Sequence, residues 1–207
     1  AGAAAGTVAP LRPGSRPEVA PTSGPATDPD RWILSRTQTV IAEVTRALEH
    51  YRFGEAAQSI YQFVWHEYCD WYIELAKPRL APGSPTRAAA VATLARGLTT
   101  ALKLLHPFMP FVTEAIWQRL RAAGLVPAVE SALLLRSPWP VPEESLRAPE
   151  LERHMEAGFM PVVRGIRDIR NKLNIPRSHP LPGTVVTSAN ATMGESLTLW
   201  ESDVAAL

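Results

Sequence analysis

Apolar residues recur at steps of three and four along most of the chain, the spacing that buries one face of a helix. This pattern predicts helices over residues 29–50, 53–77, 86–105, 111–121 and 148–173. The stripe of the first helix consists of Ile33, Thr37, Val40, Val44 and Leu48. We expect Asp28 to cap this helix and Pro29 to occupy its first turn. The sequence therefore predicts a mainly α protein, built as a helical bundle.

The second predicted helix has the widest apolar face, and prolines mark the ends of several helices. Its stripe is Phe53, Ala57, Ile60, Val64, Tyr68, Trp71 and Leu75, widened by Tyr61, Trp65 and Tyr72. Pro78 ends this helix, and Pro107 and Pro110 separate the third from the fourth. Pro161 lies inside the fifth apolar run, where its missing N–H predicts a kink or a break. Residues 122–150 are predicted to be mostly loop.

These patterns divide the chain into three parts. Residues 1–27 are rich in Ala, Pro and Arg and predict a tail or linker, because so few apolar side chains cannot offset the entropy of ordering. Residues 28–176 form the helical domain. Residues 177–207 predict a short α/β remnant, with one strand at 184–187 and a helix at 192–207. A lone strand leaves backbone groups unpaired, so its partner lies either in residues missing from this chain or in another molecule. We expect neighbouring proteins to pair the strand and to hold the tail.

Composition excludes several classes of protein. With 46% hydrophobic and 20% charged residues, the chain has the composition of a soluble globular protein. A net charge of +1 means that any affinity for RNA must come from local patches. The lone cysteine, Cys69, excludes an internal disulfide, and no histidines have metal-ligand spacing. The apolar runs are shorter than the roughly 20 residues that cross a bilayer, so we expect no metal, no cofactor and no membrane.

Several stretches occur in an order that resembles one family. Asp30-Arg31-Trp32 is followed by Cys69-Asp70-Trp71-Tyr72, then His106-Pro107-Phe108-Met109-Pro110-Phe111, and finally Arg164-Gly165-Ile166-Arg167-Asp168-Ile169-Arg170 with Asn174-Ile175-Pro176. Over residues 28–190 this set is similar to the helical anticodon-binding domain of class I synthetases, and specifically to that of the valyl-tRNA synthetases. The resemblance implies a helical bundle that receives the anticodon stem-loop of a tRNA.

The chain departs from that family in three ways. The two nucleotide-binding signatures of the family and a Rossmann phosphate loop are absent, so we expect no catalysis in this chain. The family's C-terminal coiled coil is absent as well. In the family, a helix with an Asn-Lys-x-Trp-Asn-Ala-like run precedes the Asp-Arg-Trp opening, whereas residues 1–27 of this chain are the Ala/Pro/Arg tail. This difference puts specific anticodon recognition in question.

Basic residues are the best candidates for RNA contacts. They are Arg164, Arg167, Arg170, Lys172 and Arg177 near the end of the fifth helix, Lys77, Arg79 and Arg87 around the loop after the second, and Arg12 and Arg16 in the tail. Guanidinium groups bind phosphate in a bidentate manner. A solvated face with ion pairs to Glu152 or Glu156 is the structural alternative. Trp65 is a candidate for base stacking, with a core position as the alternative.

Other polar residues favour structural roles. Asp70 and Glu74 lie one turn apart but have no nucleophile or metal partner, so we expect structural pairing, for example of Glu74 with Lys77. His106 is expected to bond at a helix end, and Cys69 to be buried and inert.

Three functions remain open at this stage. The first is a non-catalytic RNA-binding subunit of a large ribonucleoprotein, such as an organellar ribosome, that binds rRNA. The second is a fragment of an active valyl-tRNA synthetase that binds tRNA, and the third is a protein–protein docking module. A chain that begins at Ala1 rather than Met favours a processed or partial polypeptide. The first function implies a mitochondrion or another organelle, and the second also allows the cytoplasm.

Overall fold

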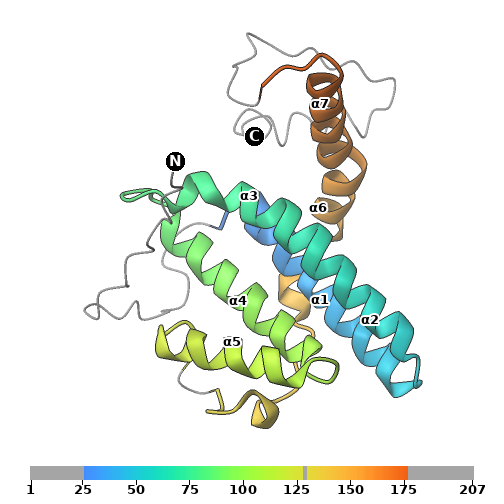
Figure 1. Ribbon diagram of the computed structural model, residues 1–207, viewed down its shortest axis with the longest axis vertical. Helices are drawn as coiled ribbons and strands as arrows, with labels where there is room; N and C mark the ends of the chain where they lie inside the picture. The colour runs from blue at the N-terminus through green and yellow to red at the C-terminus, as the bar shows by residue number, and fades with distance from the viewer. Residues whose placement is uncertain (1–25, 128–129, 177–207) are drawn as a thin grey trace, which may run out of the picture.

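The computed structural model describes residues 26–127 and 130–176, which form a bundle of helices (Figure 1). The main helices are α1 (Asp28–Glu49), α2 (Phe53–Tyr61), α3 (Ile73–Ala76), α4 (Arg87–Leu105), α5 (Pro110–Ala122), α6 (Pro149–His154) and α7 (Met160–Lys172). Two π-helical segments, η1 (Gln62–Tyr72) and η5 (Met155–Phe159), join α2 to α3 and α6 to α7. Short 3-10 turns are η2 (Lys77–Leu80), η3 (Leu134–Arg136) and η4 (Glu144–Leu146). No strand occurs in these described ranges, so the mainly α prediction is confirmed.

The long antiparallel pair formed by α1 and the continuous α2–η1–α3 rod is the centre of the bundle. Helix α4 packs against both members of this pair, and α5 packs against α4. Helix α6 packs against α1, and α7 then extends beyond the end of the pair (Figure 1). Residues 1–25 of the predicted tail, and the predicted strand and last helix within residues 177–207, lie outside the described residues.

Helix α1 begins one residue earlier than its sequence predicts. Thr27 rather than Asp28 is the capping residue, and Asp30 accepts a hydrogen bond from the backbone N–H of Thr27 at 3.0 Å. A carboxylate that reaches back to the cap satisfies a donor that the first turn would otherwise leave unpaired. Three apolar residues of the predicted stripe, Ile33, Val40 and Val44, are buried, which confirms the predicted core-facing side of α1.

The rod that contains η1 corrects the predicted core of the second helix. Ile60, Tyr68, Trp71 and Leu75 are buried as predicted, but Phe53 and Ala57 are exposed, and Ala56 and Phe63 are buried instead. A π-helix bonds residue i to i+5, so each of its turns takes up more residues than an α-helical turn. The apolar stripe is therefore displaced from the register that an α-helix would give.

Helix α4 approaches η1 through small side chains. Ala89, Ala90, Gly97 and Ala101 are buried, whereas Leu94, Leu98 and Leu105 are only half-buried. A Cβ placed on Gly97 would lie 2.6 Å from Cε2 of Tyr68. The hydroxyl of Tyr68 donates to the carbonyl of Leu94 at 2.7 Å, which fixes this close approach. Among the described helices, α4 alone is long and apolar enough to cross a membrane, a test that core helices of soluble proteins also pass.

The fifth predicted helix continues past the proline inside it, through a π-helical turn rather than a break. Phe159 and Met160 keep right-handed helical dihedrals where η5 meets α7, and the N–H of Met160 donates to the carbonyl of Met155. Pro161 follows directly and has no N–H to donate, so the regular α-helical bonding is disturbed at this point. Between α5 and α6, the residues that the structure describes contain only the short turns η3 and η4, which confirms the predicted loop.

Candidate nucleic-acid interface

Two arginines of α7 stack on one buried tryptophan. The guanidinium carbons of Arg164 and Arg167 lie 5.6 and 5.3 Å from the ring centroid of Trp71, which belongs to η1. Phe159 meets the same indole edge-on, with ring centroids 5.8 Å apart. A guanidinium over an aromatic face is attracted by the ring quadrupole and keeps its N–H edges free to bond elsewhere. The packing thus holds two cations side by side where the rod meets α7.

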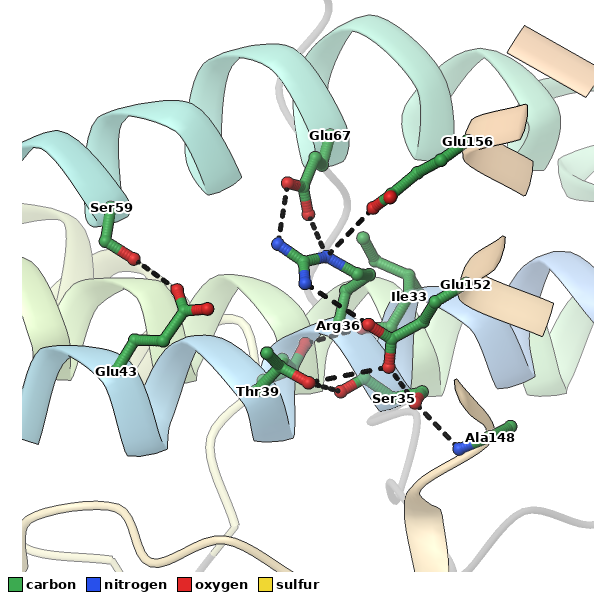
Figure 2. Close-up of polar contacts among 11 residues, drawn as sticks. Ile33, Ser35, Arg36, Thr39, Glu43, Ser59, Glu67, Ala148, Glu152 and Glu156 are labelled. Atoms are coloured by element: carbon green, nitrogen blue, oxygen red, sulfur yellow. Dashed lines mark hydrogen bonds and ion pairs between the residues drawn. The ribbon is translucent and has the colours of Figure 1, made fainter. Parts of the chain in front are cut away.

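Both arginines remain exposed to solvent, and the acidic residues expected to neutralise them bind a different partner. No carboxylate of the described residues forms an ion pair with Arg164 or Arg167. Glu152 and Glu156 face Arg36 of α1 instead, at 3.2 and 4.0 Å (Figure 2). The alternative that Arg164 and Arg167 form ion pairs with Glu152 or Glu156 is therefore wrong.

The remaining cations of this segment differ in their surroundings. Lys172 is exposed in the last turn of α7. Arg170 is half-buried and donates to the carbonyl of Pro176 at 2.5 Å. Arg177 lies outside the described residues. Asp168 is the single acidic residue between positions 160 and 176, so the exposed part of α7 is strongly basic.

The second predicted cluster does not form one surface. Lys77 pairs with Glu74 at 2.5 Å, which confirms the structural pairing expected for that carboxylate. Arg87 is exposed and donates to the carbonyl of Leu80 at 3.0 Å. Arg79 instead points into the bundle, where its side chain is 12% exposed and binds Asp30. Arg12 and Arg16 lie outside the described residues.

Arg79 and Asp30 belong to a buried polar network at the start of α1. Asp30 is fully buried and accepts hydrogen bonds from Arg79 at 2.8 and 2.6 Å and from the Tyr72 hydroxyl at 2.6 Å. Burial alone would raise the pKa of Asp30, but the hydrogen bonds from Arg79, Tyr72 and the Thr27 backbone outweigh it and hold this pKa below 3.8. A phosphate approaching Arg79 would therefore have to compete with Asp30 for its guanidinium group.

A second buried network joins three helical segments and was missed by sequence reasoning. Arg36 binds both carboxylate oxygens of Glu67 at 2.8 and 2.9 Å and one oxygen of Glu152 at 3.2 Å (Figure 2). Ser35 donates to Glu152 and accepts from the backbone N–H of Ala148 at 2.7 Å. These contacts fix η1 and α6 on α1, and so they set the direction in which α7 leaves the bundle. The partners lie up to 117 residues apart, so no local pattern signals them.

The aromatic residues of the rod differ in their exposure, which decides which of them could stack on a base. Trp65 is 55% exposed and Tyr61 is similarly exposed one turn away, so Trp65 is not a core residue, whereas Tyr68 and Trp71 are buried. Tyr61 was expected only to widen the apolar stripe, and its exposure was not predicted.

The other polar candidates have structural partners. Asp70 pairs with His66 at 3.3 Å, and the Nδ1 of His106 lies 2.8 Å from the Thr113 hydroxyl. Cys69 is half-buried, and burial raises the pKa of its thiol. No group of three or more potential metal ligands occurs among the described residues.

These features match a known family. Residues 30–185 match the family described as the anticodon-binding domain of tRNA ligase, and the chain belongs to that family. The chain is 45% identical over 147 residues to a valine–tRNA ligase of Carboxydothermus hydrogenoformans, covering 71% of this chain and 16% of the relative. It is 41% identical to the Chromobacterium violaceum enzyme (80% and 17%) and 43% identical to that of Thermotoga maritima (72% and 16%). The chain thus spans about one sixth of the length of these relatives.

Proposed function

We propose that this domain binds the anticodon arm of a tRNA through the exposed cationic side of α7, and that it contributes binding rather than aminoacylation chemistry. The observation that carries the proposal is the pair of solvent-exposed guanidinium groups held over Trp71 by Arg164 and Arg167. Both belong to the stretch matched by the anticodon-binding family. Two fixed guanidiniums suit consecutive phosphates of an RNA backbone, where each can donate two hydrogen bonds.

Phosphate contacts alone position an RNA without reading its sequence. The exposed Trp65 offers an aromatic face on which an unpaired base could stack, a contact worth roughly 1–3 kcal/mol. We assign the backbone contacts to α7, with Lys172 as a further cation, and leave Trp65 as the candidate base platform on η1. Valine tRNA is the proposed RNA, because the similar relatives are valine–tRNA ligases.

The direct experiment is a titration of the 207-residue chain with a fluorescent anticodon stem-loop of valine tRNA. Stem-loops with other anticodons and an unrelated RNA hairpin serve as competitors. The proposal expects saturable binding that weakens steeply with salt, because phosphate contacts release counterions. Equal competition by every hairpin would restrict the function to non-specific RNA binding, and no binding at low salt would contradict it.

A structural subunit of a ribonucleoprotein, such as an organellar ribosome, is the second candidate. It is favoured by residues 1–27, whose Ala/Pro/Arg composition is typical of a tail and not of the helix that the family resemblance implies before this domain. The two candidates differ in what travels with the native protein. Purification with ribosomal RNA and many proteins, at an intact mass near 22.6 kDa, supports the subunit. A polypeptide several times larger that carries valine tRNA supports the synthetase domain.

A further inference from the structure

Helix α7 has an apolar stripe that the bundle covers only in part. Val162, Ile166, Ile169 and Leu173 follow one another at steps of four, three and four residues, so they share one side of the helix. Val162 is buried and Ile166 is half-buried, but Ile169 is 57% exposed and Leu173 is 64% exposed. Arg164 and Arg167 lie on the opposite side, over Trp71. The stripe therefore continues past the bundle onto a helix that extends away from it (Figure 1).

The end of α7 turns the chain back towards this stripe. Asn174 adopts a left-handed conformation with φ of 51°, and the N–H of Ile175 donates to the carbonyl of Arg170 at 2.9 Å. The N–H of Asn174 donates to the backbone carbonyl of Asn171 at 3.2 Å, which completes a Schellman motif. In this motif the residue after the turn commonly packs on side chains one turn back, and Ile175 is correspondingly half-buried.

The segment that follows has a sequence suited to the exposed stripe. Residues 192–207, for which the sequence predicts a helix, carry Leu197, Trp200, Val204 and Leu207 at steps of three, four and three. The same residues include Glu195, Glu201 and Asp203 but no Lys or Arg, whereas Arg170 and Lys172 flank the apolar stripe of α7 on either side. Apolar spacing and charge are thus complementary between the two segments.

We propose that residues 192–207 dock as an acidic amphipathic segment on the Val162–Ile166–Ile169–Leu173 side of α7. The connecting residues 177–191 can span about 50 Å when extended, more than twice the roughly 20 Å length of α7, so either direction of docking is accessible. The contact covers the apolar side and leaves Arg164 and Arg167 open on the other. The partner of this face is therefore the chain's own C-terminal segment, and the inference does not depend on RNA binding.

Hydrogen–deuterium exchange of the full chain, followed by mass spectrometry, tests this docking. The test variant is Ile169→Gln with Leu173→Gln, which removes apolar side chains but keeps good helix formers. The control is Asn171→Gln, at an exposed position on the cationic side of the same helix. We expect peptides from 192–207 to be protected in the wild type and in the control, and to exchange about tenfold faster or more in the test variant. Peptides from α1 and α4 report whether the bundle stays folded.

Three outcomes would overturn the proposal. Residues 192–207 that exchange like an unfolded chain in the wild type show that nothing docks. Protection that survives the double substitution shows that the segment packs elsewhere. Protection that falls on dilution of the protein shows that a second copy, rather than the same chain, covers the stripe.

Discussion

Arg79 and Asp30 form a bidentate ion pair inside the bundle, with nitrogen–oxygen distances of 2.8 and 2.6 Å. The pair joins the turn after α3 to the first turn of α1, 49 residues earlier in the chain. Tyr72 adds a third hydrogen bond to the same carboxylate. Removal of one member of a buried pair leaves an unpaired charge, which typically costs 3–5 kcal/mol.

We therefore expect Arg79→Ala to lower the free energy of unfolding by about 3–5 kcal/mol. Denaturant unfolding monitored by circular dichroism measures this loss. The matched control is Arg87→Ala, since Arg87 belongs to the same predicted cluster but is exposed and should cost less than about 1 kcal/mol. Equal losses in both variants would show that the Asp30 pair is not a special stabilising contact.

The same pair predicts a dependence of stability on pH. The pKa of Asp30 is lower in the folded protein than its ordinary value of 3.8. Its contribution to stability is therefore fully present above that ordinary value and is lost as pH falls through the folded pKa. Unfolding midpoints measured between pH 7 and pH 2 should fall in acid, and Asp30→Asn should be less stable at pH 7 but show a smaller decline. A decline of the same size in Asp30→Asn would assign the acid sensitivity to other carboxylates.

Glu156 predicts a pH effect of the opposite sign. Burial raises the pKa of Glu156, Arg36 opposes this shift, and the nearby Glu67 and Glu152 add to it. An acid whose pKa is raised on folding stabilises the protein below its unfolded value and loses that contribution as pH rises through the folded value. Glu156→Gln should therefore unfold at slightly higher denaturant concentration at pH 7, and this gain should vanish below about pH 4.5. A variant that is less stable than the wild type at pH 7 would contradict this account.

Two glycines provide a matched pair of substitutions in helices. Alanine is the better helix former by about 1 kcal/mol, so Gly165→Ala, where a Cβ meets no atom within 4 Å, should stabilise the protein by about that amount. Gly97→Ala should destabilise it by about 1–3 kcal/mol, because the new Cβ would lie 2.6 Å from the Tyr68 ring. Thermal unfolding of both variants measures the difference. Stabilisation by Gly97→Ala would mean that α4 and η1 do not approach this closely.

Sequence periodicity predicted the helices well because it depends on local spacing alone. The ranges of α1, α4 and α5 and the irregular helical turn next to Pro161 follow from apolar steps and prolines. The π-helical η1 was not predicted, since its hydrogen bonding depends on how the rod packs against α1 and α4. It moved Phe53 out of the core and Phe63 into it.

The candidate site was predicted only in part, because local spacing shows which residues share a helix face but not which distant residues they bind. Arg164 and Arg167 share a helix face by their spacing, and the structure places both over Trp71. Arg79 looked equally suitable in sequence, because nothing near it indicates a buried carboxylate 49 residues away. The Arg36 network could not be predicted from the sequence either, because the two carboxylate partners of Arg36 lie 31 and 116 residues from it.

RNA binding on the Arg164–Arg167 side of α7 can be tested with two double variants, whose affinity for the anticodon stem-loop is measured across a series of salt concentrations. Arg164→Gln with Arg167→Gln removes the two guanidiniums over Trp71, and Arg46→Gln with Arg119→Gln removes the same charge from exposed positions on α1 and α5. We expect weaker binding for the first variant only, with a salt slope reduced by roughly 0.7 to 0.9 for each arginine removed. Equal weakening of both variants, or an unchanged salt slope in the first, would contradict RNA binding on this side of α7.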